Sequence, residues 1–203
     1  MNNERGRPRG FCKDEALDKA LAVFWKHGFQ GASLAELTAA MGVNKPSLYA
    51  AFGDKESLYL KALARYAGQQ LTQSLAALDA EPDACRAVEA YLRAVAVMQT
   101  NPVLPGGCFV VTGAADCGTA SMPVAIENAL VAAIQSGEAR ITLRLERAQR
   151  EGQLPLSTRI GDLSSLLIAV IVGMGVLAKS GAPLEKLNQV VSCAMAAWPT
   201  AAT

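Results

Sequence analysis

The stretch from residue 33 to residue 58, SLAELTAAMGVNKPSLYAAFGDKESL, constrains the fold of this 203-residue chain more than any other. Its first part is typical of a short helix, because three apolar residues recur at helical spacing: Leu34, Leu37 and Met41. Ser33 is a natural N-cap for this helix, and Glu36 completes a capping box with it. Gly42 then permits the positive φ that ends a helix. The sequence therefore predicts a short helix followed by a sharp turn.

A second short helix follows at once. Asn44 is a suitable N-cap, and Pro46 is tolerated in the first turn, where its missing N–H has no intrahelical partner. Leu48 and Phe52 form the apolar side of this helix, and Asp54 caps the helix after it. The outward side carries small, polar and basic side chains: Lys45, Ser47, Tyr49 and Ala50.

Two short helices joined by a tight glycine turn predict helix-turn-helix geometry. The outward side chains suit the major groove of DNA, since Lys45 and Ser47 can reach phosphates or base edges and Tyr49 can donate its hydroxyl to a phosphate. Ala50 is small enough to let the helix sit deep in the groove. A plain helical hairpin would account for any one of these residues, but not for the joint pattern.

The run GVNKPSLYAAFGDKESL closely resembles the signature of TetR-type transcriptional regulators. It has a Gly-Val turn, a polar cap, Leu-Tyr in the recognition helix, an aromatic residue three positions later, and Lys-Glu-x-Leu at the start of the next helix. The resemblance continues backwards through ALDKALAVFWKHGFQGASLAELTAAMGV and is specific over residues 13–60. No departure from the family pattern is evident in this stretch.

The resemblance implies a homodimeric DNA-binding repressor. Such a protein binds a pseudo-palindromic operator in double-stranded DNA and releases it when a small-molecule effector, here unknown, binds the helical C-terminal domain. Taken with the helix-turn-helix pattern, it indicates that the following residues contact DNA: Arg5, Arg7, Arg9, Ser33, Asn44, Lys45, Ser47, Tyr49 and Lys55.

Composition supports an all-α fold, because 51% of the residues are hydrophobic while only 5% are aromatic. We expect a three-helix helix-turn-helix DNA-binding domain at residues 10–70 and a helical effector-binding and dimerisation domain at residues 71–203. The helices outside the central pair are expected at residues 14–27, 54–78, 83–99, 109–115, 122–149, 160–179 and 184–197.

The net charge of +1 gives the chain no global basic field. Local charge decides nucleic-acid binding, however, and the basic residues gather at the N-terminus, where Arg5, Arg7, Arg9 and Lys13 stand against Glu4 before Asp14. A solvated tail and an arm that follows the minor groove when DNA is present are compatible interpretations of this segment.

We expect a cytoplasmic protein without a membrane partner. The N-terminus is polar and has no signal-peptide pattern. The most hydrophobic segment, residues 163–178, has sixteen uncharged residues, which is short of the ~20 needed to span a bilayer. The five scattered cysteines and the single histidine, His27, do not form a disulfide framework or a zinc-ligand pattern, so we expect neither a metal nor a cofactor.

The segment at residues 160–179 is apolar nearly all round, which requires burial on more than one side. In a chain of this size a partner subunit is the simplest second side. We therefore expect a dimer interface on the last two helices, formed by Leu166, Val170, Gly173, Leu177, Leu187 and Val191.

Residues 101–123 are the least helical stretch, with three prolines and four glycines. Packing around an irregular segment in a helical domain is the least complete, and the Gly-Gly-Cys that enters its apolar run resembles the cavity-lining segment of some TetR-type regulators. We expect an effector cavity lined by Tyr66, Tyr91, Val95, Cys108, Phe109, Val111 and Met122.

Two alternatives to a reversible effector follow from the sequence. A thiol-based sensor of oxidants or electrophiles would use Cys108, although a free cysteine is more often a small buried hydrophobe, and reactivity requires a lowered pKa. An enzyme with an active site among the C-terminal helices has less support, because the chain has neither a Ser/His/Asp arrangement nor a phosphate loop.

Overall fold

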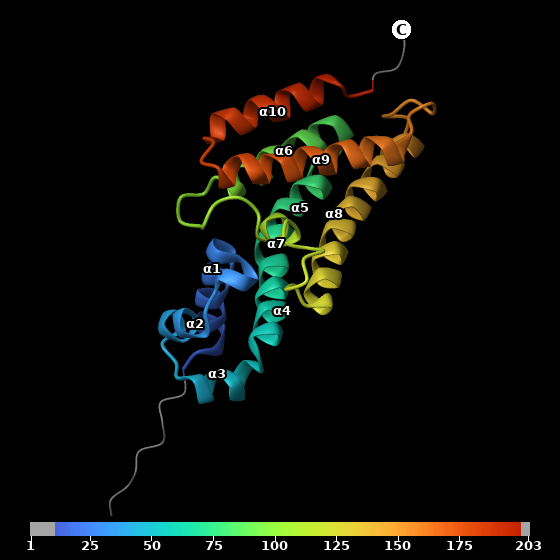
Figure 1. Cartoon of the computed structure of the whole chain (residues 1–203). Coiled ribbons are helices and arrows are strands. Elements are labelled where there is room, and N and C mark those ends of the chain that lie inside the picture. Colours follow the sequence, from blue (N-terminus) through green and yellow to red (C-terminus); the bar gives the residue numbers. More distant parts are fainter. Residues whose placement is uncertain (1–10, 200–203) are drawn as a thin grey trace, which may run out of the picture.

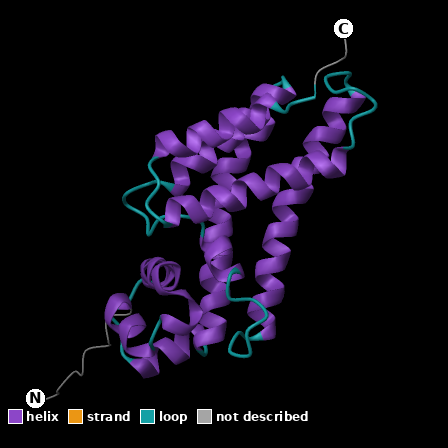
Figure 2. Ribbon diagram, turned by 45° about the horizontal axis from the view of Figure 1, so that its top comes forward, coloured by secondary structure: helices purple, strands orange, loops and turns teal. Residues whose placement is uncertain are grey.

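A computed structural model describes residues 11–199, and every regular element in this range is a helix (Figures 1 and 2). The first three are α1 (Lys13–Gly31), α2 (Leu34–Met41) and α3 (Lys45–Phe52). Ser33 and Glu36 form the expected capping box at the start of α2, and Gly42 ends that helix with a φ of 69°. The helix-turn-helix predicted from the sequence is therefore present.

Helix α1 is interrupted where a break was expected. Gly28 has a φ of 70° and a ψ of −179°, which lie outside the helical range. The chain then adds a further turn that runs to Gly31 before α2 begins. This extra turn carries Phe29 into the core, where only 8% of it is exposed.

The long rod expected at residues 54–78 is present but is not a uniform α-helix. It consists of α4 (Lys55–Tyr66), a π-helical turn η1 (Ala67–Leu71) and α5 (Thr72–Ala80). A π turn accommodates one additional residue between two α-helical stretches. The rod ends before Glu81, at the break expected from Glu81-Pro82-Asp83.

The remaining helices are α6 (Ala84–Gln99), α7 (Phe109–Ala114), α8 (Val124–Arg150), α9 (Ile160–Lys179) and α10 (Leu184–Ala196). In Figure 1, α3 lies at one end of the molecule, and α9, α10 and the C-terminal end of α8 lie at the other. The rod formed by α4, η1 and α5 connects the two ends.

Two clusters of buried residues hold the helices together. The first combines α1–α4 with α7 and the N-terminal half of α8, and the second combines α5, α6, the C-terminal half of α8, α9 and α10. The helix-turn-helix unit therefore shares its core with α7 and α8 and has no separate core of its own. This shared core gives α7 contacts with both α1 and α9.

Helix α9 is long and apolar enough by composition to cross a membrane, with a mean hydropathy of 2.2 over its most apolar 18 residues. It packs against α6, α7, α8 and α10, and 22% of the same stretch is buried within the chain. A core helix of a soluble protein has the same composition, so this property is weak evidence for a membrane span.

Candidate nucleic-acid interface and cavity

Helix α3 presents one side to solvent because its other side is fully packed. Leu48 and Phe52 point into the core with exposed fractions of 0% and 4%. The side chain of Asn44 accepts a hydrogen bond of 2.8 Å from the backbone N–H of Ser47, which fixes the first turn. Lys45 is exposed, and 46% of Tyr49 is exposed. The short helix therefore offers a positively charged group and a phenolic hydroxyl on its outer side.

The C-terminal end of α3 is held by α4. The ammonium group of Lys61 donates a hydrogen bond of 3.0 Å to the backbone carbonyl of Phe52. Asp54 accepts a hydrogen bond of 2.7 Å from the backbone N–H of Ser57, and so caps α4. No local sequence signal marks Lys61 as a supporting residue, because this capping contact spans nine positions.

Two of the predicted DNA contacts also take part in structural interactions. The Lys55 ammonium lies 4.6 Å from the centroid of the Phe29 ring, and partial burial lowers the pKa of Lys55. Ser33 accepts from the backbone N–H of Glu36 at 3.1 Å and donates to its carboxylate at 2.8 Å. We call α1, α2 and α3 the reading unit. Lys55 and Ser33 therefore help to stabilise the reading unit in the absence of DNA. Arg5, Arg7 and Arg9 lie outside the described residues.

An arginine fixes α1 against α4. Arg65 donates to Asp18 at 2.6 Å and to Asp14 at 3.1 Å. The hydrogen bond from Arg65 is the main reason that the pKa of Asp18 is lowered. The contact therefore links α1 to the last turn of α4, which continues through η1 into α5.

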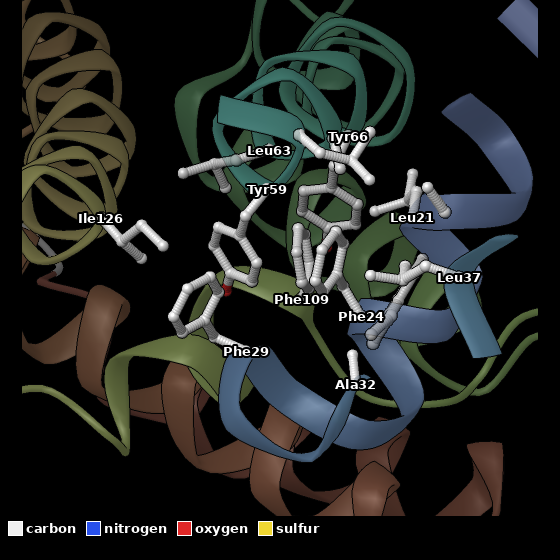
Figure 3. Close-up of a cluster of buried hydrophobic side chains, with 14 of the residues drawn as sticks. Leu21, Phe24, Phe29, Ala32, Leu37, Tyr59, Leu63, Tyr66, Phe109 and Ile126 are labelled. Atoms are coloured by element: carbon white, nitrogen blue, oxygen red, sulfur yellow. The ribbon is translucent and has the colours of Figure 1, made fainter. Parts of the chain in front are cut away.

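A cluster of aromatic side chains on α1, α4 and α7 joins the reading unit to α7 (Figure 3). We call it the aromatic cluster, and its members are Phe24, Trp25, Phe29, Tyr59, Tyr66 and Phe109. The ring of Tyr59 packs against those of Phe24 and Phe109, with both centroid distances equal to 5.0 Å. The Tyr59 hydroxyl is buried and has no hydrogen-bond partner among the described residues, and burial raises its pKa. It lies so close to Gly113 that a Cβ built there would be 2.5 Å from it. Aromatic packing therefore leaves no space between α4 and α7.

A small cavity lies behind α7, with a volume of about 60 Å³. Three of the seven residues predicted to line an effector cavity do line it: Tyr91, Cys108 and Val111. The others in its wall come from the end of η1, from α7, from the middle of α8 and from α9: Leu71, Val110, Ala133, Ile134, Gly137, Ile168, Ile171 and Val172. These residues were not predicted, because most of them belong to apolar stripes that look like ordinary helix cores.

Four predicted lining residues are placed elsewhere. Phe109 is fully buried in the aromatic cluster, and Tyr66 packs edge-on against it with ring centroids 5.7 Å apart. Val95 belongs to the second buried cluster. Met122 precedes α8, and at ~1.5 Å per helical residue it lies far below the cavity-lining Ile134. A larger surface hollow, of about 600 Å³, lies between the loop after α6 and the α9–α10 turn and uses none of the seven.

Cys108 is buried against the cavity, and the Tyr66 hydroxyl donates a hydrogen bond of 3.2 Å to its sulfur. Burial raises the pKa of the Cys108 thiol, and the hydrogen bond from Tyr66 opposes that change only in part. Burial also raises the pKa of Tyr91, to about 12. The Cys108 thiol and the phenols of Tyr66 and Tyr91, whose pKa values are all raised, are therefore neutral near pH 7.

The structure separates the six predicted interface residues into two groups. Gly173 is exposed, the exposed fractions of Leu166 and Leu177 are 44% and 37%, and Val170 is half-buried beside them on α9. Leu187 and Val191 are 0% exposed and belong to the second buried cluster, because their side of α10 packs against this chain's own α6 and α9. This placement corrects the expectation for Leu187 and Val191.

In residues 11–199, no group of three or more histidine, cysteine, aspartate or glutamate side chains is arranged to hold a metal ion. The cysteines in this range are all free, and the exposed ones are Cys12 and Cys193.

Two stretches of the chain, one near the N-terminus and one in the C-terminal part, match models of known protein families. Residues 16–62 match the model described as bacterial regulatory proteins, tetR family. Residues 84–192 match the model described as tetracyclin repressor-like, C-terminal domain.

Individual relatives agree with these matches. The chain is 35% identical over 201 residues to the HTH-type transcriptional repressor ComR of Escherichia coli (strain K12), an alignment that covers 98% of this chain and 94% of ComR. It is 45% identical over 65 residues to the repressor BdcR of the same strain, covering 32% of this chain and 33% of BdcR.

The solved structures include a cysteine mutant of the TetR family transcriptional regulator CifR, complexed with a 26-base-pair double-strand operator DNA. This structure matches with a TM-score of 0.90 at 39% identity and covers 95% of this chain and 100% of the CifR chain. The reduced form of NemR from E. coli, at 20% identity and a TM-score of 0.76, shares the fold.

Proposed function

The chain belongs to the tetR family of bacterial regulatory proteins, and from this membership we propose that it represses transcription by binding operator DNA through α3. The observation that carries the proposal is the outer side of α3, where Lys45 and Tyr49 are exposed on a helix whose caps and buried side chains are fixed. CifR, a relative at 39% identity, binds double-strand operator DNA. A short, rigid helix with exposed polar groups is suited to the major groove.

We propose that the protein is a homodimer and that the exposed side of α9 forms the interface between its two subunits. Leu166, Gly173 and Leu177 recur at helical spacing along a side of α9 that this chain does not cover. An isologous contact between two copies would bury this stripe and present two α3 helices to one side of the DNA. The half-sites would then lie about 34–36 Å apart, or a multiple of that distance, on a pseudo-palindrome.

The effector site is proposed at the cavity behind α7. A volume of about 60 Å³ is too small for a drug-sized ligand, which usually occupies ~300 Å³ or more, so the walls must move apart when an effector binds. The lining is mainly apolar and includes Tyr91, which favours a mainly apolar molecule with one polar group.

Helix α7 connects this cavity to the reading unit. Cys108 and Val111 face the cavity, while Phe109 packs on Tyr59 in the aromatic cluster. Because that cluster leaves no free space, displacement of α7 would displace α4 and α1 as well. An effector releases DNA only if it binds the released conformation more tightly, and operator DNA must then weaken effector binding by the same factor.

Selection from a random pool of double-stranded DNA by the purified protein tests the repressor proposal. We expect enrichment of an inverted repeat, and we expect a Lys45→Ala/Tyr49→Ala variant that retains its helical circular dichroism to enrich no sequence. Enrichment of the same sequence by this variant would show that the DNA-binding interface does not lie on α3. Once an operator is known, effector affinity measured with and without saturating operator tests the cavity mechanism, which requires equal coupling in both directions.

A thiol-based sensor remains a second candidate, because the Cys108 sulfur lies at the cavity and accepts a hydrogen bond from Tyr66. The raised pKa of Cys108 opposes formation of the reactive thiolate, so the cavity would have to open first. Under N-ethylmaleimide, a thiol sensor releases the operator in wild type and in Cys193→Ser, but not in Cys108→Ser. Release of Cys108→Ser to the same extent as wild type would remove this candidate and leave the reversible effector in place.

We infer a cytoplasmic regulator without catalytic activity. Regulators of this family bind DNA in the cytoplasm, and the exposed apolar side of α9 is explained by a partner subunit. The described part of the chain contains no arrangement of side chains that requires a catalytic explanation.

A further inference from the structure

A pocket of about 220 Å³ lies between the end of α5 and the last turns of α8. Four of its seven lining residues are arginines that recur every three or four positions on one side of α8, and the full lining is Leu78, Asp79, Arg140, Leu143, Arg144, Arg147 and Arg150. In Figure 1, the C-terminal end of α8 lies at the opposite end of the molecule from α3. Contact with the operator bound by α3 therefore does not explain this concentration of positive charge.

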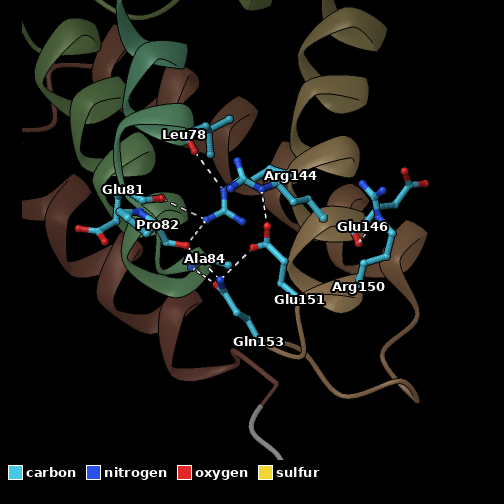
Figure 4. Close-up of polar contacts among 10 residues, drawn as sticks. Leu78, Glu81, Pro82, Ala84, Arg144, Glu146, Arg150, Glu151 and Gln153 are labelled. Atoms are coloured by element: carbon cyan, nitrogen blue, oxygen red, sulfur yellow. Dashed lines mark hydrogen bonds and ion pairs between the residues drawn. The ribbon is translucent and has the colours of Figure 1, made fainter.

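Arg144 lines the pocket and is only 5% exposed, and its guanidinium lies beside Leu78, Glu81 and Pro82 (Figure 4). Its Nε donates to the carbonyl of Leu78 at 3.1 Å, and its Nη2 donates to the carbonyls of Glu81 at 3.2 Å and Pro82 at 2.9 Å. Its Nη1 is buried and has no hydrogen-bond partner among residues 11–199. Carbonyls satisfy donors but carry no net charge, so a buried cation is left without an ion-pair partner.

The other three arginines are only weakly engaged. Arg140 pairs with Asp79 at 2.7 Å and Arg147 pairs with Glu151 at 2.7 Å, with side chains that are between 38% and 65% exposed. Exposed pairs of this kind contribute little and can be exchanged for another anion. The Nε of Arg150 contacts only the backbone carbonyl of Glu146, at 3.4 Å.

Besides Asp79, which lines the pocket, a second carboxylate lies beside these arginines: Glu151, the partner of Arg147. Its pKa is lowered by the hydrogen bond and charge of Arg147 and, to a smaller degree, by the charges of Arg144 and Arg150. Three guanidinium groups therefore favour negative charge at one place. Glu151 is exposed and lies one residue beyond α8, so it can move aside.

We propose that this arginine pocket, formed by Arg140, Arg144, Arg147 and Arg150, binds an oxyanion group of a small molecule. Arg147 and Arg150 provide the direct contacts, because the planar guanidinium fork matches the oxygens of a phosphate or carboxylate. Arg144 adds its positive charge, and Glu151 engages Arg147 in the absence of the ligand. The volume of 220 Å³ accommodates a phosphate with a small organic substituent.

Isothermal titration of the full-length protein without DNA tests this proposal. The probes are inorganic phosphate, phenyl phosphate and benzoate at constant ionic strength, because salt screens such contacts. We expect saturable binding of at least one probe. Free phosphate as the ligand predicts equal binding of the two phosphates, an organic phosphate predicts tighter binding of phenyl phosphate, and a carboxylate ligand predicts that benzoate binds best.

Variants locate the binding. Arg150→Gln should weaken it about ten-fold, which is the effect of losing one charge-assisted hydrogen bond, and Glu151→Gln should strengthen it by removing the internal competitor. Arg159→Gln is the matched control, because Arg159 is an exposed arginine outside the pocket that pairs with Asp162 at 3.0 Å. Arg144 is left unchanged, since its hydrogen bonds also close the end of α5.

Two results would overturn the proposal: no saturable binding of any probe, or equal loss of affinity in Arg150→Gln and Arg159→Gln. Because the titration contains no DNA, neither result bears on repression through α3.

Discussion

The ammonium nitrogen of Lys179 donates a hydrogen bond of 3.0 Å to the backbone carbonyl of Trp25, which joins the last turn of α9 to α1. Trp25 lies just before Gly28, where α1 is interrupted, and carbonyls at such an end need partners from outside the helix. Burial lowers the pKa of Lys179. The helix with the proposed dimer surface therefore contacts α1 directly as well as through α7.

Lys179→Met should destabilise the protein, because it keeps most of the apolar stem and removes the donor. A loss of about 1 kcal/mol in the free energy of unfolding is expected in urea denaturation. Lys19→Met on the exposed side of α1 is the control and should have little effect. Equal denaturation midpoints for the two variants would show that the hydrogen bond does not contribute.

Tyr59 and Gly113 should be energetically coupled. Gly113→Ala places a Cβ 2.5 Å from the Tyr59 hydroxyl oxygen and 3.0 Å from a Leu130 methyl, so we expect a loss of about 1–3 kcal/mol. Tyr59→Phe should be neutral or stabilising, because it removes a buried hydroxyl without a partner among the described residues. The double variant should recover part of the loss, and strict additivity in the double-mutant cycle would contradict the predicted clash.

Substitutions at the proposed DNA-contacting residues should fall into two groups, those that lower affinity for all DNA and those that change sequence specificity. Tyr49→Phe and Lys55→Ala should weaken binding by similar factors on every DNA sequence, because phosphate contacts position the protein without reading bases. Changes at Lys45 and Ser47 should alter which sequences are preferred. Anisotropy measurements on the selected operator and on single-base variants of it test this division, and a uniform loss for all four changes would exclude it.

Gly173→Leu should disrupt the dimer while leaving the subunit folded. No atom lies within 4 Å of a Cβ built at Gly173, so the leucine is accommodated in a single chain and meets an obstacle only in a partner. Sedimentation should show a shift toward monomer, and operator binding should fall with it. A fully dimeric Gly173→Leu protein with normal operator affinity would place the interface elsewhere.

Local signals predicted much of this structure. The capping box at Ser33, the glycine at position 42 and the proline at position 46 act within a few residues, so the sequence located α2 and α3 closely. The limits of α9, Ile160–Lys179, also agree with the sequence prediction, because a long apolar stretch ends there at Lys179 and Gly181.

Contacts between distant segments were not predictable in the same way. Leu187 and Val191 form an apolar stripe that could face a partner or the same chain, and only the packing of α10 on α6 decides between the two. Phe109 and Val111 are two residues apart on α7, and helical geometry turns one to the aromatic cluster and the other to the cavity. A list of apolar residues cannot make that distinction.

The π turn at Ala67–Leu71 places a constraint on the length of the chain. Ala62, Tyr66, Ser74 and Leu78 are all buried, and they are separated by multiples of four positions. In a uniform α-helix each residue turns about 100°, so Leu78 would point about 160° away from Ala62; the additional residue in the wide turn removes most of that error. Deletion or insertion of one residue in this stretch would rotate the helices at the α3 end against those at the α9 end by about 100°, whereas replacement of the exposed Gln69 side chain would leave the alignment unchanged.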